Sequence, residues 1–128
     1  MKSAYVEHVN VTVSDPQATA NMLVELFGWK IRWDGDGIYD GRTIHVGSEH
    51  SYLALYSKGS PNAAVPDSHS TLTGLNHIGI VVDDLDAAEA KIVAAGFQTF
   101  SHGDYEPGKR FYFHDHDRLE IEVISYAK

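Results

Sequence analysis

The chain has 128 residues, of which 43% are hydrophobic and 22% charged, a composition typical of one soluble globular domain with its own core. It contains no cysteine, so disulfides, thiolate metal sites and cysteine nucleophiles are excluded. The formal net charge is −8 and the ten basic residues are scattered, which argues against nucleic acid or an anionic membrane as a partner. Without a signal-like start or a membrane-length apolar run, the expected location is cytoplasmic.

The first half of the chain predicts a strand, a helix and three further strands. Residues 6–14 alternate in polarity and are rich in β-branched side chains, as is typical of a strand. Asp15 followed by Pro16 predicts a helix start, because a capping side chain precedes proline at the first helical position. Gly28 tolerates the left-handed conformation that ends such a helix. Three short strands are then expected at 29–34, 42–48 and 52–57.

The second half of the chain predicts the same series of elements. A strand at 75–82 is followed by a helix at 85–95, which Gly96 closes. Further strands are expected near 97–102, 109–114 and 119–126. We therefore expect a single 1–128 domain of the α+β class, built from module one (about 1–57), a Ser/Pro/Gly-rich linker (about 58–73) and module two (about 74–128). Two such βαβββ modules would form cupped mixed sheets around a shared cavity.

The two halves also match residue by residue. His8 aligns with His77 at an offset of 69 positions, and both histidines begin an alternating apolar run. Later segments align at an offset of 68, which pairs residues 42–57 with 110–125 and Arg42 with Arg110. Three matches in the same order indicate an internal repeat.

This repeat singles out a candidate metal site. Since strand residues two apart share a face, His8, His77 and Glu122 all point away from the apolar, helix-packing face of their strands. The repeat partner of Glu122 is Ala54, so a pseudo-twofold axis would gather three potential ligands and one alanine. Two imidazoles and one carboxylate can hold a divalent Fe, Mn, Zn or Ni ion with open coordination sites. The alternatives are hydrogen-bonded histidines and a solvent-facing carboxylate.

Other polar side chains are weaker candidates for chemistry. Tyr112 and His102 lie on or near strands of the second module, where either could donate a proton or orient a substrate oxygen. The alternative for both is a structural hydrogen bond. His114 and His116 fall in an expected turn, where exposure to solvent is the simpler interpretation. His45, His50 and His69 follow no organising pattern.

The sequence resembles the vicinal oxygen chelate superfamily, which includes glyoxalases, extradiol dioxygenases and bleomycin or fosfomycin resistance proteins. The resemblance covers nearly the whole chain and rests on EHVNVTVSD, GLNHIGIVVDDLDAAEAKIVAAGF and RFYFHDHDRLEIEVI. It implies the paired βαβββ fold and places His8, His77 and Glu122 on the superfamily's metal-ligand positions. It also implies a small-molecule substrate and a homodimer, in which the site is formed within one chain or between two.

Two departures from the superfamily patterns bear on the reaction. Glyoxalase I enzymes usually supply a fourth ligand, glutamate or glutamine, where this chain has Ala54, although Glu49 or water could fill that place. Extradiol dioxygenases resemble the three-ligand set better, but His116 and Arg118 stand where their signature has proline and usually glycine. His102 also lies one residue too far upstream for that signature.

These observations predict a divalent-metal-dependent enzyme that acts on a small molecule through vicinal oxygens. Dioxygenase-related chemistry is favoured over glyoxalase-like chemistry, because three ligands leave more coordination sites open. The alternative is a metal-free protein of the bleomycin-resistance type that binds or sequesters an aromatic or antibiotic-like molecule.

Overall fold

A computed structural model describes residues 2–127 and divides the chain into two compact units on either side of the bond between Asn62 and Ala63. The first unit contains β1 (His8–Thr12), α1 (Pro16–Phe27), β2 (Lys30–Asp36), the short 3-10 helix η1 (Ile38–Asp40), β3 (Arg42–Gly47) and β4 (Tyr52–Ser57). The second unit contains β5 (Ile78–Val81), α2 (Leu85–Ala94), β6 (Thr99–Tyr105), β7 (Gly108–His114) and β8 (Glu120–Ser125).

Each unit forms one four-stranded mixed sheet with the same topology. The strand orders are β1-β4-β3-β2 and β5-β8-β7-β6. In both sheets the first strand of the unit runs parallel to the last one, and the other pairs are antiparallel. The fold is therefore α+β with two βαβββ modules, as the sequence predicted.

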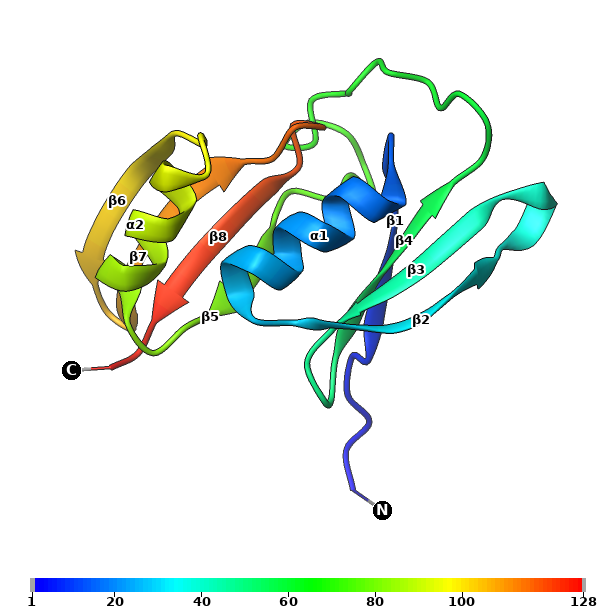
Figure 1. Ribbon diagram of the computed structural model, residues 1–128. Helices are drawn as coiled ribbons and strands as arrows, with labels where there is room; N and C mark the ends of the chain where they lie inside the picture. Colours follow the sequence, from blue (N-terminus) through cyan, green and yellow to red (C-terminus); the bar gives the residue numbers. More distant parts are fainter. Residues whose placement is uncertain (1, 128) are drawn as a thin grey trace. The chain divides into compact units, whose positions relative to one another are not determined.

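One helix packs on one face of each sheet (Figure 1). The strands next to α1 place fully buried side chains such as Ile44 and Leu55 on the helix side. In the second unit Phe111 and Val123 are fully buried on the side of α2. Because side chains alternate along a strand, their neighbours His45, Ala54, Tyr112 and Glu122 lie on the sheet face opposite the helices.

Both helices begin at the residues that the sequence pattern indicates. The carboxylate of Asp15 accepts hydrogen bonds from the backbone N–H groups of Gln17 (3.1 Å) and Ala18 (3.3 Å). Asp84 caps α2 in the same way by accepting from the N–H of Ala87 (3.0 Å). Gly28 ends α1 with a positive φ of 68°, the conformation that glycine adopts without strain.

The second unit differs from expectation at two strands. β5 is shorter than the expected 75–82, because its pairing with β8 begins only at Ile78, and His77 lies directly before it. β6 was expected at 97–102 but continues to Tyr105, where it pairs with Gly108 across a tight turn. A bulge between Phe100 and Gly103 interrupts this strand.

The expected offset of 68 is wrong for β3 and β7. Arg42 pairs with Ser57, whereas Lys109, not Arg110, pairs with Ser125. The structural counterpart of Arg42 is therefore Lys109. The reason is the loop that follows, because residues 48–51 join β3 to β4 and the longer 115–119 loop joins β7 to β8.

The Ser/Pro/Gly-rich linker is divided between the two units. Its later part is attached to the second unit, since the side chain of Arg118 donates a hydrogen bond to the carbonyl oxygen of Ala63 (2.7 Å). No helix in the described range 2–127 is long and apolar enough to span a bilayer.

Candidate functional site

A cavity of about 540 Å³ opens on the face of the second sheet that α2 does not cover. His77, Phe100, Tyr112 and Glu120 contribute to its walls, and His69 from the linker reaches it as well. Aromatic rings and titratable groups therefore share one concave surface, which is the usual composition of a small-molecule site.

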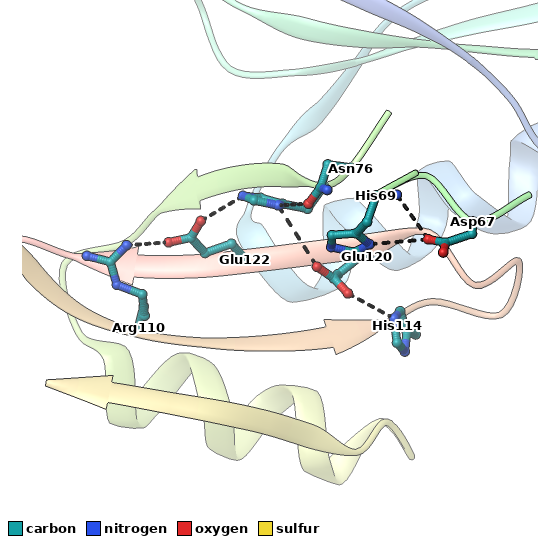
Figure 2. Close-up of polar contacts among 8 residues, drawn as sticks. Asp67, His69, Asn76, Arg110, His114, Glu120 and Glu122 are labelled. Carbon is teal, nitrogen blue, oxygen red and sulfur yellow. Dashed lines mark hydrogen bonds and ion pairs between the residues drawn. The ribbon is translucent and has the colours of Figure 1, made fainter. Parts of the chain in front are cut away.

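His77 and Glu122 meet at this surface. The Nε2 atom of His77 lies 3.0 Å from Oε1 of Glu122 (Figure 2). On the other side of the ring, Nδ1 of His77 donates a hydrogen bond to Oδ1 of Asn76 at 2.8 Å. β8 positions Glu122 directly opposite Gly79 of β5, where the space beside the glycine is open. The imidazole is thus oriented with Nε2 toward the carboxylate.

Glu122 is almost completely buried and makes two polar contacts. Its side chain is 11% exposed, and its second oxygen, Oε2, accepts a hydrogen bond from Nη1 of Arg110 at 3.0 Å. The guanidinium of Arg110 also packs over the ring of Tyr105, with 4.7 Å between Cζ and the ring centroid. Arg110 and His77 therefore give each oxygen of this nearly buried carboxylate a polar partner, as buried polar groups require.

A second carboxylate, that of Glu120, extends the row of polar side chains formed by Arg110, Glu122 and His77. Oε1 of Glu120 lies 3.2 Å from Nε2 of His114, and Oε2 of Glu120 lies 3.9 Å from Nδ1 of His77 (Figure 2). His114, expected in a turn, is the last residue of β7. The row therefore runs from the half-exposed His114 to the buried Glu122.

Tyr112 lies beside the histidine. Its ring meets that of His77 edge to face, with 5.6 Å between centroids, and β7 pairs it directly with Glu122. Burial, together with the negative charge of Glu122, raises the pKa of Tyr112 above its ordinary value of 10.0. Its hydroxyl therefore remains protonated around neutral pH and can donate a hydrogen bond.

His102 borders the same cavity, but its imidazole is tied to α2. Its Nε2 lies 2.6 Å from Oε2 of Glu89, and the same carboxylate oxygen accepts a hydrogen bond from the hydroxyl of Thr99. These two hydrogen bonds lower the pKa of Glu89, with that from Thr99 contributing most. The contact joins β6 to α2.

The first unit presents His8 on the equivalent strand. Nδ1 of His8 lies 3.0 Å from Oε1 of Glu7, and its ring stacks on Tyr52 with 4.9 Å between centroids. The guanidinium of Arg32 lies over the same tyrosine ring at 4.6 Å. His8 is thus oriented by a neighbouring side-chain oxygen, just as His77 is.

His45 lies on this face too, and the sequence analysis missed it. β3 places His45 directly opposite Ala54, as β7 places Tyr112 opposite Glu122. Its ring stacks on Tyr52 at 4.5 Å, and burial lowers its pKa, with further contributions from the positive charges of His8 and Arg32. The alternation of His45 with the apolar Ile44 and Val46 was the available signal that His45 lies on the face away from the helix. The expected offset of 68 aligned His45 with Phe113, whereas its structural counterpart is Tyr112.

The second unit brings together two of the three predicted ligands, His77 and Glu122, while His8 belongs to the first unit. Among residues 2–127 no three His, Asp or Glu side chains gather at one point as a metal cluster. The donor chemistry of the pair nevertheless fits a divalent ion, because an oriented imidazole nitrogen and a carboxylate oxygen converge beside an open cavity.

Sequence comparison identifies the family. The model of the Glyoxalase/Bleomycin resistance protein/Dioxygenase superfamily matches residues 5–123, so the chain belongs to this superfamily. One curated relative is an NADP-specific glutamate dehydrogenase of Neurospora crassa, which is 27% identical over 108 residues and 77% of this chain. The chain spans only 24% of the length of that relative, so the match carries no argument about activity.

Solved structures show the same fold. A glyoxylase/bleomycin resistance protein/dioxygenase domain from Frankia sp. EAN1pec is similar over 97% of this chain and 98% of its own, with a TM-score of 0.81 and 23% identity. TnmS3, an antibiotic binding protein from Streptomyces sp. CB03234, is similar over 98% of both chains (TM-score 0.71, 20% identity). A mutant of the fosfomycin resistance protein FosX from Listeria monocytogenes, in complex with Mn(II) and a dihydroxypropylphosphonic acid, covers 99% of this chain and 95% of its own (TM-score 0.73, 15% identity).

Proposed function

We propose that this chain is a divalent-metal-dependent enzyme that binds a small molecule through two neighbouring oxygens and carries out dioxygenase-related or glyoxalase-like chemistry. The observation that carries the proposal is the approach of His77 Nε2 to Glu122 Oε1 at 3.0 Å beside a cavity of about 540 Å³. His8, oriented like His77, completes the proposed ligand set.

The proposed cofactor is one divalent ion, Fe, Mn, Zn or Ni, held by His8, His77 and Glu122. Two imidazoles and a carboxylate suit all four ions. When bound, such an ion supplies a Lewis acid for substrate oxygens, or redox chemistry toward O₂. The FosX structure in complex with Mn(II) and a dihydroxy compound supports this choice, because it shares the fold.

Tyr112 is the proposed proton donor and substrate-orienting residue. Its ring is in edge contact with His77, and its raised pKa keeps the hydroxyl protonated. His102 was the other candidate, but its Nε2 is engaged by Glu89, which makes it the weaker one. The rings of Phe100 and Tyr105 would shape the binding surface around the substrate.

Dioxygenase-related chemistry is favoured over glyoxalase I chemistry by the residue that corresponds to Glu122 in the first repeat. That residue is Ala54, flanked by Asn10 of β1 and His45 of β3. No carboxylate or amide from residue 54 can therefore supply a fourth ligand, and more coordination sites remain for substrate. We further propose that both modules act as one functional domain, and that the protein is a cytoplasmic homodimer.

The second candidate is a metal-free protein that binds an aromatic or antibiotic-like molecule. The likeness to TnmS3 and the aromatic walls of the cavity favour it. In that case the contacts of Glu122 with His77 and Arg110 are structural, and no metal ion is needed.

Metal analysis followed by activity assays separates the two candidates. Protein purified without chelators and reconstituted with Fe(II), Mn(II), Zn(II) or Ni(II) is tested with catechols by O₂ uptake, and with glutathione hemithioacetals by thioester formation. We expect metal-dependent turnover in one assay, and its loss in Glu122→Ala. A protein that binds none of these ions but retains an aromatic ligand would favour the binding protein and contradict the enzyme.

A further inference from the structure

The cavity of the second unit places a pair of aromatic rings beside a carboxylate. β6 pairs Phe100 directly with Tyr112 of β7, and the two rings stack with 6.0 Å between centroids and 25° between planes. Both residues line the cavity, and so does Glu120. Glu120 lies on the same sheet face as Glu122, because strand residues two apart share a face. The cavity therefore offers a flat aromatic surface together with an acidic group.

The carboxylate of Glu120 keeps one oxygen able to accept from a ligand. Its Oε1 lies 3.2 Å from Nε2 of His114, but its Oε2 lies 3.9 Å from Nδ1 of His77, which is beyond hydrogen-bond distance (Figure 2). Glu120 is 19% exposed, so its negative charge is screened less than that of a carboxylate in open solvent. Oε2 can therefore bind a positively charged donor inside the cavity.

The cavity provides no comparable partner for an anion. Among residues 2–127, no lysine or arginine lines it. The guanidinium of Arg110 packs over Tyr105 of the wall, but it is already paired with Glu122 at 3.0 Å. The histidines of the wall each contact a carboxylate, in the pairs His69–Asp67, His77–Glu122 and His102–Glu89. An anionic ligand would therefore be repelled by Glu120 without an unpaired permanent cation to offset that repulsion.

We propose that this cavity selects an organic cation: an aromatic molecule whose short side chain ends in a protonated amine. Its ring lies against Phe100 and Tyr112, and its ammonium group donates to Oε2 of Glu120. Aromatic faces attract cations as well, so the rings and the carboxylate act together. The inference rests on the proposed function only in taking this cavity as the small-molecule site, and it holds for an enzyme and for a binding protein alike.

Three ligands with the same phenyl ring and two-carbon chain test this selection at neutral pH. They are 2-phenylethylamine, which is cationic, 2-phenylethanol, which is neutral, and 3-phenylpropionate, which is anionic. Isothermal titration calorimetry at constant ionic strength gives their dissociation constants for protein freed of metal by a chelator. The same titrations are made on Glu120→Gln, which keeps the size of the side chain and removes its charge. The matched control is Glu49→Gln, the same change at a carboxylate that is 83% exposed in the first unit. Thermal unfolding checks that both variants fold.

We expect wild-type protein to bind the amine about 10-fold more tightly than the propionate, with the alcohol in between, since an ion pair and the aromatic faces both favour the cation. Glu120→Gln should reduce this ratio to about threefold or less, whereas Glu49→Gln should leave it unchanged. Equal affinities in wild type, tighter binding of the propionate, or binding of none of the three ligands would overturn the inference. A ratio that survives in Glu120→Gln would overturn it too.

These results are separate from those that test the proposed enzyme, because the titrations are made without metal. Absence of the amine preference, with metal-dependent turnover intact, would overturn this inference alone. A retained amine preference that depends on Glu120, without turnover, would support the inference and contradict the proposed enzyme.

Discussion

Glu122 is a nearly buried carboxylate with a polar partner at each of its two oxygens. Its side chain is 11% exposed, yet it faces His77 on one oxygen and Arg110 on the other, each at 3.0 Å. Arg110 is itself 13% exposed, so both members of this ion pair are largely removed from water. Removing one partner of such a pair leaves an uncompensated buried charge, which is costly.

Arg110→Met should therefore lower the free energy of unfolding by about 3 kcal/mol. The matched control is Lys109→Met, one residue earlier, because the Lys109–Asp104 pair is 62% and 77% exposed. The control should cost less than about 0.5 kcal/mol, since exposed ion pairs contribute little. Urea denaturation of both variants measures the difference. Equal losses in the two variants would show that the Arg110–Glu122 pair is not the stabilising contact described here.

Tyr112→Phe should separate ion binding from chemistry. Removing the hydroxyl leaves His8, His77 and Glu122 in place, so affinity for a divalent ion should stay within about twofold, while turnover falls on the order of 100-fold. Because the pKa of Tyr112 is raised above 10.0, no ionisation of this phenol should appear in the neutral part of the wild-type pH–rate profile. Unchanged turnover in Tyr112→Phe would remove the tyrosine from the proposed mechanism.

At the scale of elements, the sequence pattern was sufficient wherever local chemistry decides the structure. Asp15 caps the first helix as expected, the second helix begins at the expected residue 85, and alternation placed Glu122 on the correct face of its strand. The predicted alignment of β3 with β7 between the two repeats was wrong by one residue, because the 115–119 loop is one residue longer than the 48–51 loop. Arg118 takes a positive φ of 67° in the longer loop, which a repeat alignment alone does not reveal.

The same one-residue slip explains why His45 was overlooked. With the observed strand pairing it corresponds to Tyr112, and its place opposite Ala54 becomes evident. The hydrogen bond between Glu89 and His102 could not be predicted either, since it depends on the bulge between Phe100 and Gly103. Strand pairing determines the position of His45, and the β6 bulge determines the contact of Glu89 with His102; neither can be derived from local sequence.

The contact between α2 and β6 should make stability depend on pH. The folded-state pKa of Glu89 is depressed below its ordinary value of 4.5, so its contribution is present above that pH and is lost as the pH falls through the folded-state pKa. We expect Glu89→Gln to reduce unfolding free energy by ~1 kcal/mol at neutral pH and by progressively less in acid. Glu49→Gln, whose carboxylate is 83% exposed beside His50, is the control. A loss of unfolding free energy in Glu89→Gln that grows toward low pH would contradict a stabilising role of the ionised Glu89.

For the whole molecule, the repeated order of elements predicted the α+β class, and the resemblance of three sequence segments predicted the superfamily; both are confirmed. Each βαβββ unit buries its own core, so periodicity within each half contained the necessary information. The proposed metal site differs, because its ligands come from both units: His8 from the first, His77 and Glu122 from the second. Local sequence patterns identify such residues but do not determine how the units assemble.

Equilibrium binding of a divalent ion to wild-type protein, His77→Ala and His50→Ala tests directly whether His77 is a metal ligand. His77 is a proposed ligand, whereas His50 is a surface histidine that is 89% exposed. After dialysis against Mn(II) or Zn(II) and elemental analysis, we predict about one ion per chain in wild type and in His50→Ala, with less than a tenth of that in His77→Ala. Full occupancy in His77→Ala, or no bound ion in wild type, would contradict the account.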